Sequence, residues 1–141
     1  MAETPRYGQQ TKARKAALDV LYSAELRDLG SSEVLEFTQT QSGAQARELT
    51  RAIIDGVAAN RREIDQRITA ALSAKWTLQR MPAIDRNLAR IAVWELHYTD
   101  TPAGVVIAEA VKLAGDLSTD ESSAFLNGLL VAVREDAANH D

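Results

Sequence analysis

The sequence predicts an all-α fold: a single compact bundle of about seven helices, whose two halves are candidate packed subdomains. Apolar residues recur at intervals of three and four along most of the chain, the spacing of one buried helix face. No segment shows the two-residue alternation of a strand above background. With 141 residues, 45% of them hydrophobic, the chain has enough apolar material for one domain with its own core.

The first half of the chain divides into a leader and several helices. Residues 1–8 are expected to form a flexible leader, because they are polar and contain two helix breakers. A helix is predicted over about 10–28, and a shorter one over 34–39. The apolar period then continues from 44 to 74. A single helix of that length would be about 46 Å long, too long for this domain, so we expect a break within 56–62.

The second half begins with an irregular link over 74–82, in which Trp76 and Leu78 are expected to anchor the core. Residues 83–98 form the most apolar predicted helix, which indicates a central element surrounded by others. The pair Thr101–Pro102 starts the next helix, because proline is tolerated in a first turn.

In the last third of the chain, the sequence pattern predicts a helix, an acidic turn and a second helix that contains Gly128. A glycine inside a helix costs about 1 kcal/mol relative to alanine, so we expect Gly128 to allow a close backbone approach. The helical domain is expected to span 9–137, and a flexible tail to follow at 138–141.

Several classes of protein are disfavoured. The absence of cysteine excludes disulfides and thiolate chemistry, and it fits a reducing cytoplasm, which is the predicted location. No apolar run approaches the roughly 20 residues that span a bilayer. His97 and His140 have no partner at a metal-ligand spacing, and no nucleophile elbow, phosphate loop or dinucleotide motif is present. We therefore expect neither an enzyme nor a metal or cofactor.

The charge is unevenly distributed. The net charge is −4, yet residues 6–15 contain four basic residues and no acidic one, whereas residues 100–141 contain two basic and eight acidic residues. A basic end on an acidic body can bind phosphates, because salt limits charge interactions to about 8 Å. The alternative is that the basic end is only a solvated surface.

Two residues of the first helix suggest a binder of single-stranded RNA. Lys15 and Tyr22 are seven positions apart, which places them on one line roughly 10 Å apart. A cation for phosphate and a ring for base stacking are what such a surface needs, and Lys12 and Arg14 flank the line. From the residues alone, Tyr22 is equally well interpreted as a half-buried core aromatic, and Phe125, at the edge of an apolar stripe, as a core residue.

Four segments in order carry a resemblance to a known family. They are ARKAALDVLY at 13–22, IDRNLARIAVWEL at 84–96, EAVKLA at 109–114 and FLNG at 125–128. In these segments the chain resembles the NusB family of bacterial transcription antitermination factors, and the likeness spans most of the chain.

The resemblance implies an all-α, non-enzymatic protein that binds boxA-type RNA of ribosomal RNA operon transcripts. It also implies a small-subunit ribosomal protein, NusE, as partner, and an antitermination complex with RNA polymerase that suppresses premature termination. Together with the basic leader, it predicts a set of RNA-binding residues: Arg6, Lys12, Arg14, Lys15, Tyr22, Phe125 and Asn127.

Two of the implied roles have structural alternatives. Asp85 matches an acidic family position that faces the basic partner, but an acid in a first helical turn also complements the helix dipole. Asn127 is also suited to a structural role such as a cap. The alternative for the whole chain is a self-associating helical interaction module, a homodimer with no direct RNA role.

Overall fold

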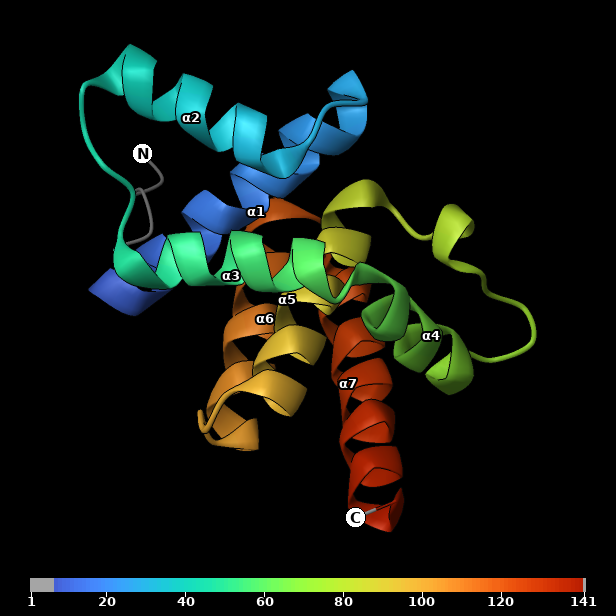
Figure 1. Cartoon of the computed structure of the whole chain (residues 1–141). Coiled ribbons are helices and arrows are strands. Elements are labelled where there is room, and N and C mark those ends of the chain that lie inside the picture. The colour runs from blue at the N-terminus through green and yellow to red at the C-terminus, as the bar shows by residue number, and fades with distance from the viewer. Residues whose placement is uncertain (1–6, 141) are drawn as a thin grey trace, which may run out of the picture.

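The computed structural model describes residues 7–140, with the side chains described as far as Asp136. Within this range there are seven α-helices, one 3₁₀ helix and no strand, which confirms the predicted all-α fold (Figure 1). The elements are α1 (Gln9–Arg27), α2 (Ser31–Ser42), α3 (Glu48–Ala59), α4 (Arg61–Ala71), η1 (Leu78–Arg80), α5 (Ala83–Tyr98), α6 (Ala103–Leu117) and α7 (Asp120–His140).

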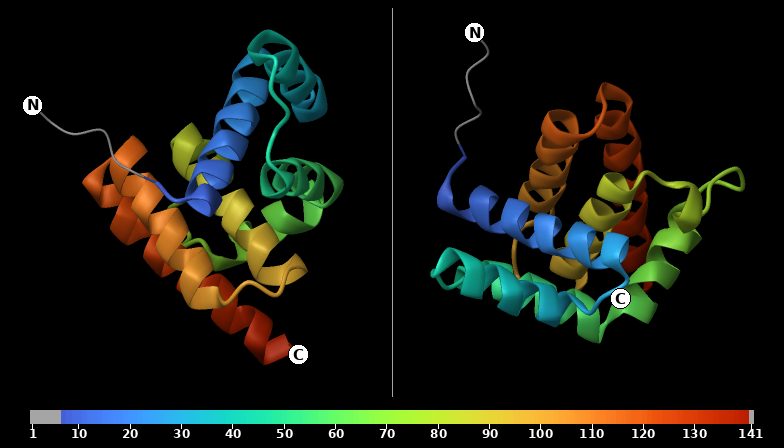
Figure 2. Two further views of the ribbon diagram at one scale, coloured as in Figure 1. Left: turned by 90° about the vertical axis from the view of Figure 1, so that its left-hand side faces the viewer. Right: turned by 90° about the horizontal axis from the view of Figure 1, so that it is seen from above.

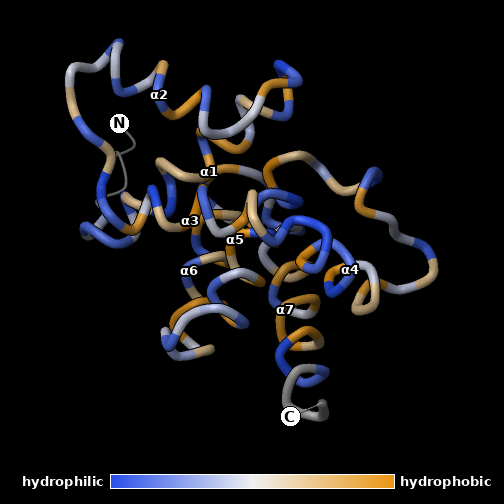
Figure 3. The backbone as a smooth tube through the Cα atoms, in the orientation of Figure 1, coloured by the Kyte–Doolittle hydropathy of each residue, from blue (hydrophilic) through white to orange (hydrophobic). Residues whose placement is uncertain are grey.

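Helix α5 is the central element, as its apolar sequence predicts. Every residue from 88 to 95 is buried, and the helix contacts α1, α3, α4, α6 and α7. Helices α6 and α7 pack side by side against it (Figure 2). Hydrophobic residues gather where these helices meet (Figure 3), and the buried side chains form one cluster that draws on both halves of the chain. The two halves therefore share a single core.

The predicted break in the long apolar segment lies at Asn60, between α3 and α4. The Asn60 side-chain amide donates a 2.9 Å hydrogen bond to the carbonyl oxygen of Gly56, and its backbone N–H donates to the same oxygen. Because the side chain competes for a helical acceptor, the chain turns here and starts a new helix.

The glycine that permits a close approach is Gly56, and the expectation for Gly128 is wrong. A Cβ atom at Gly56 would overlap the indole ring of Trp94 in α5. A Cβ atom at Gly128 would meet nothing within 4 Å among the described residues, so this exposed position makes no use of a missing side chain inside the fold.

Other boundaries differ from the sequence expectations in detail. Helix α2 is longer than predicted and ends at Gly43, which adopts a left-handed backbone conformation (φ 70°) that favours glycine. Proline precedes the first residue of both α5 and α6, as expected for the second. Leu78 packs against the core, but Trp76 is 40% exposed, so the expected anchoring role of Trp76 is wrong. No helix in the described part of the chain is long and apolar enough to cross a membrane.

We predict opposite effects for the same substitution at two helical glycines. Gly56→Ala should destabilise the protein by about 1–3 kcal/mol, because the new methyl group collides with Trp94. Gly128→Ala, the matched control, should stabilise it by up to about 1 kcal/mol through helix propensity alone. Urea unfolding followed by circular dichroism measures both values. Equal stabilities of the two variants would contradict the close packing at Gly56.

Candidate nucleic-acid interface

The outer face of α1 carries three of the predicted RNA-binding residues. Lys12 is exposed, Lys15 is partly exposed and Tyr22 is half-buried. The Lys15 ammonium group lies 3.1 Å from the carboxylate of Asp19, one turn later, in an exposed pair of little energetic weight. The opposite side of α1 packs on α3 and α5. These three residues therefore face away from the core, with the Tyr22 ring only partly accessible.

Arg14 lies inside the protein, which corrects its expected place on the RNA-binding surface. Its side chain is 6% exposed and makes a bidentate pair with Glu95 of α5, in which Nε and Nη2 each donate a 2.8 Å hydrogen bond. Nη1 also donates a 3.1 Å bond to Glu109 of α6, which Thr11 joins at 2.8 Å. The hydrogen bonds to Glu95 raise the pKa of Arg14 above its usual value, against the effect of burial.

The position of Arg14 on the helix explains the correction. Arg14 lies three and four positions before Ala17 and Leu18, which are both buried, so it continues the apolar stripe of α1. The helical period could have placed it inside. Its partners are 81 and 95 residues away and give no local signal.

Tyr7, the first described residue, contacts the end of α6. Its hydroxyl donates a 2.8 Å hydrogen bond to Asp116 near the end of α6, and the ammonium group of Lys112 lies 5.3 Å from the ring centre. Burial raises the pKa of Tyr7 to about 12, together with the hydrogen bond to Asp116 and its charge. Sequence reasoning missed this contact. The predicted RNA-binding residue Arg6 lies outside the described residues.

Asp85 is 2% exposed, which corrects the expectation that it faces a partner. Its Oδ2 accepts a 2.7 Å hydrogen bond from the hydroxyl of Ser122 in α7, and its Oδ1 is buried with no hydrogen-bond partner among the described residues. It lies in the first turn of α5, where an acidic side chain complements the helix dipole. Asp85 thus connects the start of α5 to the first turn of α7.

The two remaining predicted residues lie just beyond that connection, on α7. Phe125 is half-buried and Asn127 is exposed. The Phe125 ring packs against Trp76 with 5.3 Å between ring centres and an angle of 49° between ring planes. The guanidinium carbon of Arg80 lies 5.8 Å from the centre of the Trp76 ring. Trp76 and Arg80 lie about fifty residues before Phe125, so no local pattern in the sequence associates them with it.

Arg86 of α5 connects α1 to the link between α4 and α5, which carries Trp76. It donates hydrogen bonds of 2.9 and 2.6 Å to Glu25 of α1, and bonds of 2.9 and 2.7 Å to the carbonyl oxygens of Leu78 and Met81. The hydrogen bond from Arg86 lowers the pKa of Glu25. This partly buried cluster holds α1, the link and α5 in a fixed arrangement.

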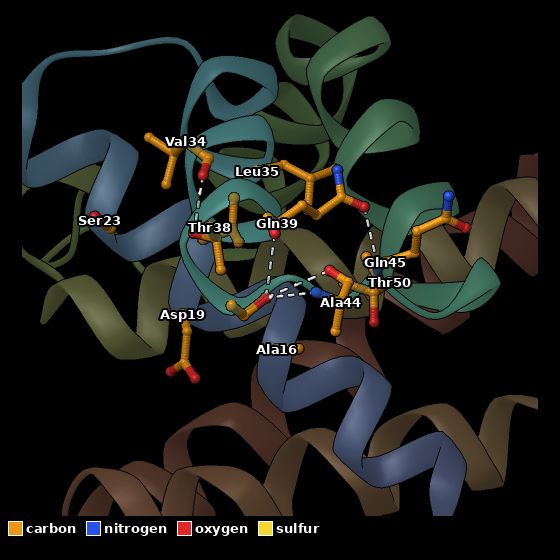
Figure 4. Close-up of a pocket in the computed structure, with 13 residues that line it drawn as sticks. Ala16, Asp19, Ser23, Val34, Leu35, Thr38, Gln39, Ala44, Gln45 and Thr50 are labelled. Carbon is orange, nitrogen blue, oxygen red and sulfur yellow. Dashed lines mark hydrogen bonds between the residues drawn. The ribbon is translucent and has the colours of Figure 1, made fainter.

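A pocket between α1 and α2 has a volume of about 250 Å³ (Figure 4). Val20, Val34 and Leu35 form part of its wall. Its polar Gln39 is already engaged, because its side-chain oxygen accepts bonds from the backbone of Ala46 and from Arg51. The described residues include no group of three histidine or acidic side chains that could hold a metal. The exposed lysines of α1, with Tyr22 and Phe125, therefore remain the candidate site.

Comparison with known proteins finds a matching family, similar sequences and similar structures. Residues 11–135 match the model of the NusB family. The chain is 50% identical over 130 residues to the transcription antitermination protein NusB of Acidothermus cellulolyticus, covering 92% of this chain and 89% of that protein. It also matches the solved structure of T. maritima NusB with a TM-score of 0.80, 30% identity and coverage of 96% and 94% of the two chains. A complex of antitermination factors NusB and NusE with double-stranded RNA matches in fold, with a TM-score of 0.79 at 24% identity and coverage of 90% and 96%.

We predict that Arg14 and Lys12 respond differently to truncation. Arg14→Ala should lower the free energy of unfolding by about 3–5 kcal/mol, because it leaves the buried Glu95 without its counter-ion. Lys12→Ala, an exposed control on the same helix, should change it by less than about 0.5 kcal/mol. Urea unfolding measures both. If Arg14→Ala were as stable as the wild type, the buried pair would not exist in solution.

Tyr7 should titrate at a higher pH than a tyrosine in an unfolded chain. Its pKa is raised above that of an unfolded tyrosine, so the Tyr7–Asp116 hydrogen bond stabilises the fold fully below about pH 10, and this contribution is lost as the pH rises towards about 12. The difference between the near-ultraviolet titrations of the wild type and Tyr7→Phe isolates this group. Asp116→Asn should move the transition to lower pH, and a wild-type transition near pH 10 would show that Tyr7 is neither buried nor bonded to Asp116.

Proposed function

The chain belongs to the NusB family, and from this premise we propose that it is a non-enzymatic transcription antitermination factor that binds boxA-type, single-stranded RNA of ribosomal RNA operon transcripts. It does so together with the small-subunit ribosomal protein NusE, within an antitermination complex of RNA polymerase in the cytoplasm. The observation that carries the proposal is the family match over residues 11–135, with 50% identity to a NusB antitermination protein.

The RNA-binding surface runs from the outer face of α1 to the first turns of α7. Lys12 and Lys15 pair with phosphates, while the accessible parts of Tyr22 and Phe125 receive bases and Asn127 supplies a polar contact. Stacking contributes about 1–3 kcal/mol per base, which is more than an exposed lysine–phosphate pair provides. The bases therefore provide most of the affinity, and the lysines set the position of the backbone.

Buried residues hold this surface in shape without touching RNA. Arg14 fixes α1 against α5 and α6, so that Lys12 and Lys15 point outward. Asp85 fixes the first turn of α7 through Ser122, one turn before Phe125. In this proposal Asp85 influences partner binding by positioning α7, because its own side chain is buried.

The proposed RNA-binding surface carries few cations, and this favours a protein partner. Two lysine–phosphate contacts give weak binding with a shallow salt dependence, since log K falls by about 0.7 per neutralised phosphate of a single strand. A basic ribosomal protein supplies further phosphate contacts. It also suits the acidic body of this chain, whose net charge is −4.

Fluorescence anisotropy with a labelled boxA RNA and a scrambled RNA, with and without NusE and at two salt concentrations, tests the proposal. We expect a preference for boxA that NusE strengthens. Equal affinity for both RNAs, or no binding even with NusE, would contradict it. Sedimentation of the free protein would show whether a homodimer competes with this assembly.

We predict that substitutions on α1 separate stacking from charge. Tyr22→Ala should weaken RNA binding about 5-fold to 150-fold at every salt concentration, because it removes one stacked base. A Lys12→Ala/Lys15→Ala double variant should reduce the slope of log K against log salt by about 1.4. An Arg62→Ala/Arg134→Ala variant removes the same charge from exposed positions on α4 and α7 and serves as the control. An equal loss in both double variants would show that only net charge matters.

A further inference from the structure

Trp76 is a large aromatic side chain that the core does not use. It lies in the link between α4 and α5, which projects from the edge of the molecule in Figure 1 and in the right-hand view of Figure 2, and it is 40% exposed. Phe125 packs on it at 5.3 Å, and the guanidinium group of Arg80 lies over the indole at 5.8 Å. An exposed ring of this size, braced by a second ring, is suited to stacking a planar ligand.

The segment that carries Trp76 is basic in sequence, although the chain is acidic overall. Residues 66–84 contain no aspartate or glutamate but contain Arg67, Lys75 and Arg80, whereas the net charge of the chain is −4. Lys75 and Arg80 are both exposed beside Trp76 in the link. This local charge attracts phosphates and repels a basic protein partner.

The link is irregular but firmly held. Arg80 donates a 2.9 Å bond to the carbonyl of Lys75 and its backbone N–H donates to Thr77, so the segment closes on itself around Trp76. Arg86 anchors the carbonyls of Leu78 and Met81, and the Met81 side chain is buried. A ligand that stacks on Trp76 therefore meets a preformed surface and needs little further ordering of the chain.

We propose that Trp76, Lys75 and Arg80 form an additional base-stacking subsite for single-stranded RNA, continuous with Phe125. The inference rests on the proposed RNA-binding function and extends its surface onto the link. One unpaired base stacks on the indole, and Lys75 and Arg80 bind the flanking phosphates. A stacked base strengthens binding about 5-fold to 150-fold. An exposed cation–π contact is worth only about 2-fold to 5-fold, so a base replaces the guanidinium group over the ring, while Arg80 keeps its bond to the Lys75 carbonyl and its other N–H groups bind phosphate.

The two tryptophans make a direct test available. Trp94 is buried at 8% exposure, so quenching of tryptophan fluorescence on titration with the unlabelled boxA RNA reports on Trp76. We expect the wild type to be quenched. Trp76→Phe should lose the quenching and keep RNA affinity within about 5-fold, because phenylalanine still stacks. Trp76→Ala should lower RNA affinity about 5-fold to 150-fold in anisotropy titrations. Phe37→Ala, which removes another exposed aromatic residue at 55% exposure, should leave affinity unchanged.

The results that would overturn the subsite differ from those that would overturn the proposed function. Normal RNA affinity of Trp76→Ala, with Tyr22→Ala impaired, would overturn the subsite and leave the proposed function standing. No RNA binding by the wild type, with NusE present, would overturn both. Loss of NusE affinity in Trp76→Ala without RNA would assign the surface to protein contact and overturn the inference. If thermal unfolding shows that Trp76→Ala is not folded, the quenching in the wild type and in Trp76→Phe, and a loss of affinity in a Lys75→Ala/Arg80→Ala variant, decide the question.

Discussion

The buried ion pair between Arg14 and Glu95 is the interaction on which the arrangement of this bundle depends. Two charged groups lose their hydration when they are buried, and this cost is recovered only when geometry is good and the remaining hydrogen bonds are made. Here the pair is bidentate, and Glu109 and Thr11 complete the network. The pair joins α1 to α5 and α6, so it fixes the rotation of α1 and determines which residues face solvent.

Helix α5 makes further buried polar contacts to its neighbours along its length. Four of its buried or half-buried polar residues connect to another helix: Asp85 to α7, Arg86 to α1, Arg90 to α1 and α4, and Glu95 to α1. An entirely apolar α5 would bury as much surface, but it would specify the rotation of its neighbours less well. Directional contacts therefore position the binding surface, while the hydrophobic core supplies most of the stability.

Local patterns in the sequence predicted the helices but not these connections. The apolar period determines where helices lie, and a break near Asn60 follows from helix length, so both were accessible from the sequence. The roles of Arg14 and Asp85 depend on partners 81 and 37 residues away. The exposure of Trp76 likewise depends on how the link meets α7. The basic side chain of Arg14 suggests a surface cation, because its buried partner is remote in the chain.

Three arginines are held in ion pairs inside the protein, and this reduces the number of cations available to bind RNA phosphates. Arg14, Arg86 and Arg90 are held in buried or half-buried pairs, so they do not contribute to a phosphate-binding surface although the sequence counts them as basic. Of the accessible cations, the proposed RNA surface uses Lys12 and Lys15 on α1, and Lys75 and Arg80 on the link. Because log K falls by about 0.7 per neutralised phosphate, the two lysines of α1 alone give a slope of log K against log salt of magnitude about 1.4. All four cations together give a slope of magnitude about 2.8. The slope for the isolated protein therefore counts the cations that touch RNA, and a value near the larger figure requires the link to take part.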